Sequence, residues 1–189
     1  HTSYVDDFVL FAPDLGDDGT PAYEVTIAGA YPRYTYRAVD AVFGGMDGQV
    51  DILPQEVVGV RIGGAFVRAW DTATGDTLVG TPADRVALTA ITRAEHLGPL
   101  DDAYVEATVR LVARQSRVDP AADIAPPPDG YVLLGLGAGA VLHRPWGAVR
   151  FGIEGRNLTN TRYRDYNSLM RYTADAPGLD VRLRVGLDF

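Results

Sequence analysis

The 189-residue sequence contains no cysteine, which excludes a disulfide framework and a thiolate metal site. No stretch approaches the roughly 18 consecutive apolar residues that a membrane-spanning helix needs, so a helical membrane protein is excluded. Basic residues are few, because 17 Lys and Arg stand against 25 Asp and Glu, for a formal net charge of −8. A nucleic-acid-binding surface needs clustered cations, and we therefore expect no nucleic-acid partner.

Recognisable catalytic and metal-binding motifs are also lacking. There is no Gly-x-Ser-x-Gly elbow and no glycine-rich phosphate loop before a helix. The acidic stretch 14–19 lacks the spaced aspartates and closing glutamate of an EF-hand and is more simply a solvated turn. His1, His96 and His143 lie far apart in the sequence. We therefore predict no enzymatic activity, no cofactor and no metal site.

The informative signal is an alternation of apolar and polar residues, which places successive side chains on opposite faces of a strand. From residue 103 to 113 every second residue is apolar, while Glu106, Thr108 and Arg110 fall between them. The final residues 181–189 repeat this pattern. Similar segments occur at residues 4–11, 34–52, 58–70, 86–90, 131–142 and 149–153. We expect about eight strands and no helix.

The links between these segments alternate in length. Short links lie at 53–56, 98–101 and 144–147, and long polar or proline-rich links at 13–32, 71–82, 117–130 and 162–178. Short periplasmic turns and long extracellular loops are typical of outer-membrane barrels. The predicted fold is all-β, an antiparallel transmembrane β-barrel, with apolar rows facing lipid. Trp70, Trp146, Tyr131 and Tyr163 are candidates for an interfacial aromatic girdle.

The carboxy-terminal stretch carries a resemblance to a known family. It contains Asn157-Leu158, then Tyr163, then Pro177-Gly178 and a terminal alternating strand ending in Phe189. This order resembles the carboxy-terminal signature of TonB-dependent outer-membrane receptors, with Leu179 where an arginine is usual. Residues 3–9 and 40–47 resemble two earlier strands of the family barrel, with Asp47 in place of the usual glutamate.

The resemblance implies that residues 1–189 are the carboxy-terminal portion of a larger receptor barrel, with no plug domain in them. Because residues 4–11 already form a predicted strand without a leader before it, we also expect a fragment. The implied function is energy-coupled uptake of a scarce ligand, such as a siderophore or other metal chelate, in the bacterial outer membrane. The implied partners are the plug domain and earlier strands, TonB through the plug, the barrel-assembly machinery and outer-membrane lipid.

Two functional hypotheses concern individual residues. In the extracellular link, Tyr166, Arg171 and Tyr172 offer stacking surfaces and a permanent cation for an anionic chelate, although a mobile solvated loop is an equal alternative. The family resemblance implies that Phe189 is read as an assembly signal. The simpler alternative for Asn157 and Tyr163 is a turn asparagine and a strand-end aromatic.

Other classes of protein fit the same alternation. One is a complete barrel of about eight strands with a structural or adhesive role, whose interior is filled by side chains. Another is a soluble lipocalin-like carrier, in which the apolar face would point inward. Gly135, Gly137 and Gly139 alternate in one segment, where they make room for a neighbouring backbone or plug or, more simply, ease strand curvature.

Overall fold

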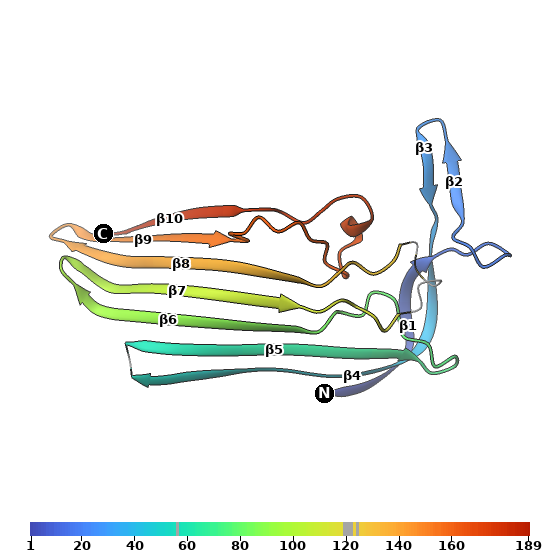
Figure 1. Cartoon of the computed structure of the whole chain (residues 1–189), viewed down its shortest axis with the longest axis horizontal. Helices are drawn as coiled ribbons and strands as arrows, with labels where there is room; N and C mark the ends of the chain where they lie inside the picture. Colours follow the sequence, from blue (N-terminus) through green and yellow to red (C-terminus); the bar gives the residue numbers. More distant parts are fainter. Residues whose placement is uncertain (56, 119–122, 124) are drawn as a thin grey trace.

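Eight long strands form one antiparallel sheet in the computed structural model, which describes residues 1–55, 57–118, 123 and 125–189. Each strand pairs with its neighbours along the chain, in the order β1-β4-β5-β6-β7-β8-β9-β10 (Figure 1). Their bounds are β1 Thr2–Pro13, β4 Tyr34–Gln55, β5 Val58–Asp71, β6 Arg85–Leu97, β7 Leu100–Val112, β8 Tyr131–Arg144, β9 Gly147–Arg156 and β10 Asp180–Asp188. The predicted antiparallel all-β fold of about eight strands is confirmed.

The sheet is an open arc in the part of the chain that the structure describes. β1 and β10 lie at its two edges, and no pairing joins them there. The alternative of a complete barrel of about eight strands requires β1 to pair with β10. The described residues do not form that barrel. No helix among the described residues is long and apolar enough to cross a membrane.

Short and long connections lie at opposite ends of the sheet (Figure 1). β6 and β7, and likewise β8 and β9, are joined by two residues, whereas the long links connect β1 to β4, β5 to β6, β7 to β8 and β9 to β10. The predicted alternation is confirmed for the described residues. Glu56 of one predicted short link, and residues 119–122 and 124 of a predicted long link, lie outside them.

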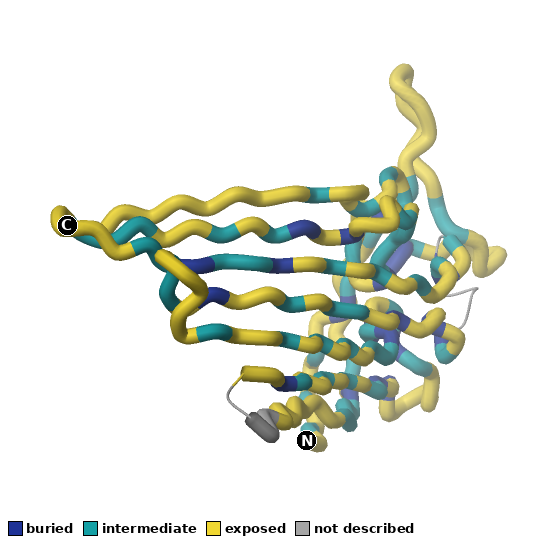
Figure 2. Tube along the Cα trace, turned by 60° about the vertical axis from the view of Figure 1, so that its left-hand side comes forward, coloured by how far each residue is buried: buried dark blue, intermediate teal, exposed yellow. Residues whose placement is uncertain are grey.

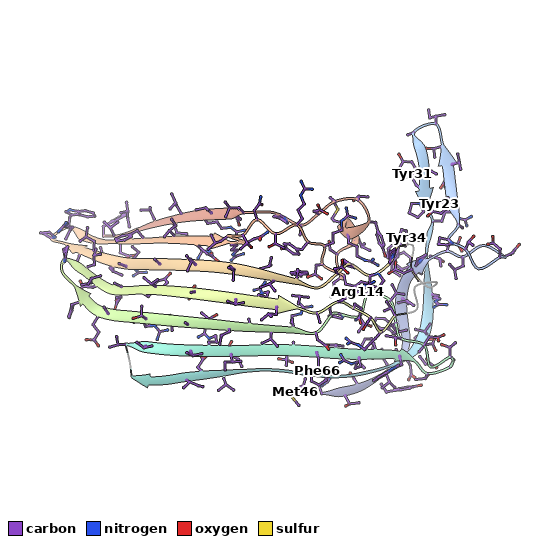
Figure 3. The ribbon with its side chains drawn as sticks, in the orientation of Figure 1. Tyr23, Tyr31, Tyr34, Met46, Phe66 and Arg114 are labelled. Atoms are coloured by element: carbon purple, nitrogen blue, oxygen red, sulfur yellow. The ribbon has the colours of Figure 1, made fainter. Side chains whose placement is uncertain are left out.

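Two small elements in the long links were not predicted. The first link folds into a hairpin of β2 (Tyr23–Thr26) and β3 (Gly29–Pro32), which projects from the sheet and carries Tyr23 and Tyr31 (Figure 3). The last link contains a 3₁₀ turn, η2 (Leu169–Tyr172), where the Ser168 hydroxyl accepts a hydrogen bond from the Met170 amide at 3.3 Å. Both elements lie at the long-loop end.

Strand pairing joins the apolar rows of separate strands into one apolar face. Val86 of β6 pairs with Leu111 of β7, which pairs with Val132 of β8. Farther along, Ile153 of β9 pairs with Leu183 of β10, which is 76% exposed. The two rows predicted to face lipid therefore belong to the same face, and that face is open to the surroundings.

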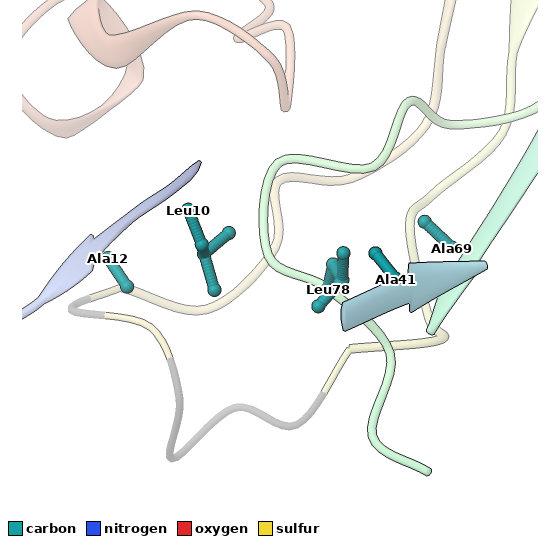
Figure 4. Close-up of a cluster of buried hydrophobic side chains, with 5 residues drawn as sticks. All are labelled: Leu10, Ala12, Ala41, Ala69 and Leu78. Atoms are coloured by element: carbon teal, nitrogen blue, oxygen red, sulfur yellow. The ribbon is translucent and has the colours of Figure 1, made fainter. Parts of the chain in front are cut away.

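The buried core is small and lies at the long-loop end of β1 and β4. It consists of Leu10, Ala12, Ala41, Ala69 and Leu78 (Figure 4). β1 departs from regular pairing between Val5 and Phe8, and its loop-end part runs across the direction of β5–β10 in the view of Figure 1. Most of the sheet is exposed or half-buried (Figure 2). A large contiguous apolar surface that the chain does not bury indicates a membrane or a partner.

Candidate functional site

The face opposite the apolar one carries most of the strand charges. Arg61 Nε of β5 lies 2.8 Å from Asp51 Oδ1 of β4. Glu154 of β9 accepts from Arg156 at 2.6 Å and from Arg184 of β10 at 3.4 Å. These pairs are largely exposed and contribute little to stability. Their arrangement makes a wall of mixed charge, suited to polar ligands, water or a polar protein segment.

A row of glycines on β8 is filled by side chains of β7 on this polar face. A Cβ at Gly137 would lie 2.8 Å from Glu106 Oε1, and a Cβ at Gly139 would lie 2.7 Å from Tyr104 Cε1. Both distances are too short for a real side chain. A Cβ would also lie 3.3 Å from the Gly155 carbonyl oxygen at Gly135 and 3.0 Å from the Phe151 carbonyl oxygen at Gly139. The glycines thus make room for the neighbouring backbone, as one of the explanations offered from the sequence holds, and also for side chains of β7.

Asn157 ties together the two ends of the link between β9 and β10. It is 4% exposed and has a φ of 48°, a conformation that asparagine tolerates better than most residues. Its Nδ2 donates to the carbonyls of Thr161 at 2.9 Å and Pro177 at 3.3 Å. Its Oδ1 accepts from the Thr161 amide at 2.9 Å. Asn157 therefore acts as a buried clamp within the loop layer, the name we use for the four long links at one end of the sheet.

The other residues of the predicted motif surround this clamp. The Leu158 amide donates to the Leu134 carbonyl of β8 at 2.9 Å. A Cβ at Gly178 would overlap Asn160 Oδ1, which accepts from the Leu179 amide at 3.1 Å. Glycine at 178 thus allows the close approach of the asparagine side chain.

Tyr163, another residue of the predicted motif, packs on Tyr131 of β8, and the two ring centroids are 4.3 Å apart. The Tyr131 hydroxyl donates to Asp165 Oδ2 at 3.2 Å. By register the Tyr131 side chain lies on the polar face, whereas the next residue, Val132, lies on the apolar face. The prediction that Tyr131 joins an interfacial girdle was therefore wrong, because strand register assigns it to the face away from lipid, whereas for Tyr163 it stays a prediction. Trp70 and Trp146 are partly exposed at opposite ends of the sheet.

Tyr166, Arg171 and Tyr172, predicted from sequence as ligand contacts, converge on Asp123. Arg171 forms an ion pair with Asp123, and the two side chains are 4% and 0% exposed. The Tyr172 hydroxyl donates to Asp123 Oδ1 at 2.7 Å, and the Tyr166 hydroxyl donates to Oδ2 at 3.2 Å. The Arg171 guanidinium lies over both rings, 4.4 Å from the Tyr166 centroid and 4.1 Å from that of Tyr172. We call these four residues the Asp123 cluster.

The Asp123 cluster is satisfied within the protein. Burial raises the pKa of Tyr166 to about 12 and raises that of Tyr172 as well, so both hydroxyls keep their protons and donate. The Tyr172 ring also lies 6.2 Å from that of Tyr34, at the start of β4. The cluster thus connects the link from β7 to β8, the link from β9 to β10 and the start of β4. A ligand would reach Arg171 only after this packing opened, and ligand contact stays a prediction.

A second polar network, half-buried at its charged residues, lies where the link between β5 and β6 meets the end of β7. Arg68 of β5 donates to both Asp84 oxygens, at 2.7 and 3.0 Å, and Arg117 reaches the same carboxylate at 3.1 Å. Hydrogen bonds from Arg68, with the charge of Arg117, hold the pKa of Asp84 below its ordinary value. Gln115, 1% exposed, donates to the Thr81 carbonyl at 2.7 Å. Sequence reasoning did not predict this network.

The remaining sequence predictions concern the chain end and metals. Phe189 is fully exposed, next to the pairing of Asp188 with Ala148 at the short-turn end, and its assembly role stays a prediction. Within the described part of the chain, no three His, Asp or Glu residues are grouped closely enough to hold a metal ion.

Comparison with known proteins gives a likeness in structure and no match in sequence. No protein-family model and no curated protein matches the sequence. Solved structures do match, among them the copper transporter OprC, with a TM-score of 0.74 and 16% sequence identity. The match covers 100% of this chain and 28% of that chain. At this identity the likeness establishes the fold alone, and the chain spans less than a third of the OprC chain.

Proposed function

We propose that this chain forms part of the wall of an outer-membrane receptor that imports a scarce ligand. The observation that carries the proposal is the separation of residue types on the two faces of one sheet. Apolar side chains from β4 to β10 line one exposed face, and charged side chains line the other. An outward lipid face and an inward polar lumen account for both.

The open edges of the sheet fit the same proposal. In hydrocarbon, unpaired amide and carbonyl groups cannot be hydrated, so a membrane sheet has to close on itself. The edges of β1 and β10 would be paired by other strands of the receptor. Outer-membrane lipid would cover the apolar face, and the plug domain would lie against the polar wall. The barrel-assembly machinery would insert the protein, reading Phe189.

The transported ligand is proposed to be a siderophore or another metal chelate, with energy supplied by TonB through the plug. OprC is a copper transporter by name, and its likeness in fold supports transport of a metal species in general terms. The Asp123 cluster would contact the ligand if the loop layer opened. We propose no catalytic role for any residue.

The decisive measurement compares the exposure to lipid and to water of two adjacent residues of strand β7. Spin labels placed at residues 109 and 110 of the full-length protein in lipid would be probed with oxygen, which partitions into hydrocarbon, and with a water-soluble nickel chelate. We expect the label at 109 to respond to oxygen and the label at 110 to the chelate. The reverse pattern, or equal access of the chelate to both, would contradict a lipid-facing apolar surface.

A further inference from the structure

A groove of about 1230 Å³ crosses the apolar face near its long-loop end, over β4 to β8. Its lining contains a set of large apolar side chains that are exposed. They include Met46, Val50, Ile62, Phe66, Val86 and Leu111. Met46 and Phe66 are paired partners on β4 and β5 (Figure 3). This volume exceeds the roughly 300 to 1,000 Å³ of sites for small organic ligands.

The floor of the groove is made by two glycines that face each other across the strands. Gly48 of β4 pairs directly with Gly64 of β5. A Cβ at Gly48 would meet no described atom within 4 Å, and one at Gly64 would meet only ordinary contacts from 3.5 Å. The lack of side chains at these two positions therefore leaves space for a flexible apolar chain.

The loop end of the groove is positively charged, in a protein whose net charge is −8. Arg68 and Arg162 line the groove there, and the Arg68 guanidinium lies 5.2 Å from the Phe66 ring centroid. Asp84 is shared between Arg68 and Arg117. Within the lining, the two guanidiniums of this face and the carboxylate of Asp84 leave a formal local charge of +1, and Arg117, which shares Asp84, lies outside the lining. Arg85 also borders the groove, but by register it lies on the polar face, so it is not counted.

A second hollow on the same face lacks this charge. It measures about 590 Å³, lies toward the short turns and has apolar residues such as Ala138, Phe151 and Leu183 in its lining. The two arginines that border it, Arg93 and Arg184, pair with Tyr104 and Gly152 and so belong to the polar face. Of these two hollows in the described part of the chain, the groove at the loop end is the one that combines an apolar floor with cations of its own face.

We propose that the groove is a specific site for a lipid with an anionic phosphate headgroup, its acyl chain over Gly48 and Gly64 and its phosphate at Arg68 and Arg162. Guanidinium groups bind phosphate oxygens in a paired geometry, and such contacts are stronger where water is excluded. This inference rests on the proposed membrane location of the apolar face. It adds a defined lipid site to what would otherwise be nonspecific contact with the bilayer.

The test is lipid retention by the full-length protein, measured by native mass spectrometry after release from nonionic detergent. Phosphatidylglycerol and phosphatidylcholine with identical acyl chains are compared at equal concentration. We expect preferential retention of phosphatidylglycerol, and a loss of roughly tenfold in that retention for the R68Q/R162Q double variant, because the charge-assisted hydrogen bonds to the phosphate are removed. R93Q, on the polar face, is the matched charge control and should leave retention unchanged.

A second variant tests the acyl chain. G48L places a side chain into the open floor, and we expect reduced retention of both lipids. G63L makes the same change on the polar face, where a Cβ would have its nearest described atom at 3.8 Å, and should retain both lipids normally. Heat-modifiable gel mobility verifies that each variant is folded, and a variant that fails this check is replaced by G48V or by single arginine substitutions.

Each outcome has a defined meaning. Equal retention of the two lipids, or unchanged retention in R68Q/R162Q, would overturn the headgroup site. Full displacement by inorganic phosphate with no effect of G48L would reduce it to an anion contact, and a dimer in place of bound lipid would assign the groove to a second copy. The spin-label pattern at 109 and 110 is independent of these results. A lipid-exposed 109 without lipid selectivity would refute this inference and leave the proposed function intact.

Discussion

The strands and the loop layer differ in which side chains they bury. Along the strands, apolar side chains such as Leu183 are exposed and the ion pairs on the other face are open to water. In the loop layer polar groups are buried, as in the Arg171–Asp123 pair and Gln115, beside a few apolar side chains such as Leu78. The difference teaches that the strands rely on their surroundings for burial, whereas the loop layer holds itself together with internal hydrogen bonds.

The largest expected effect comes from removing the buried carboxylate of the loop layer. Asp123→Ala leaves Arg171 charged and without its partner, which costs about 3 to 5 kcal/mol for a buried pair. We expect backbone amide hydrogen exchange to become faster in both the link from β7 to β8 and the link from β9 to β10. The amides of the strands should stay protected. The control is Asp129→Ala in the same link, whose side chain is 90% exposed. Exchange confined to one link would contradict a shared cluster.

The next effect tests the strands. Val109→Arg places a charge on the apolar face of β7, toward its loop end, and should cost up to about 4 kcal/mol in a bilayer. Arg110→Gln, on the opposite face of the same strand, should cost less than about 1 kcal/mol. Urea unfolding of the full-length protein in lipid vesicles measures both. Similar costs for the two variants would remove the distinction between the faces.

A smaller effect is expected at the clamp that joins strands and loops. Asn157→Ala removes three hydrogen bonds and places alanine at a φ of 48°, at a cost of about 1 to 3 kcal/mol. Protease cleavage of the link from β9 to β10 should accelerate. Asn167→Ala, at an exposed position of the same link, serves as control. A cleavage rate equal to that of the control would argue against the clamp.

The smallest effect on the folded molecule is expected at Phe189, which is fully exposed. Its deletion should lower the amount of folded protein in the outer membrane with little change in ligand affinity per folded molecule. Heat-modifiable gel mobility, with surface binding normalised to it, makes the comparison, and Phe189→Tyr should restore the yield. A normal yield after deletion would contradict the assembly hypothesis.

The sequence predicted the strands and the identity of their faces because both depend on a local signal. Alternation with period two assigns Val109 and Arg110 to opposite faces before any pairing is known. It did not predict the hairpin of β2 and β3, because the glycines, prolines and aspartates of residues 13–32 indicate turns more strongly than strands. It also misassigned Tyr131, whose face follows from the register of β8 with β7.

Tertiary structure alone decided which distant residues meet. Asp123 lies 48 residues before Arg171, and Asp84 joins Arg68 to Arg117 from three separate segments, so no local pattern marks either network. The groove over Gly48 and Gly64 likewise exists only because strand register sets the two glycines opposite each other. The sequence thus determined which side chains each strand places on each of its two faces, because successive side chains of a strand point to opposite faces. The fold decided which side chains satisfy one another, since that depends on how the loops pack.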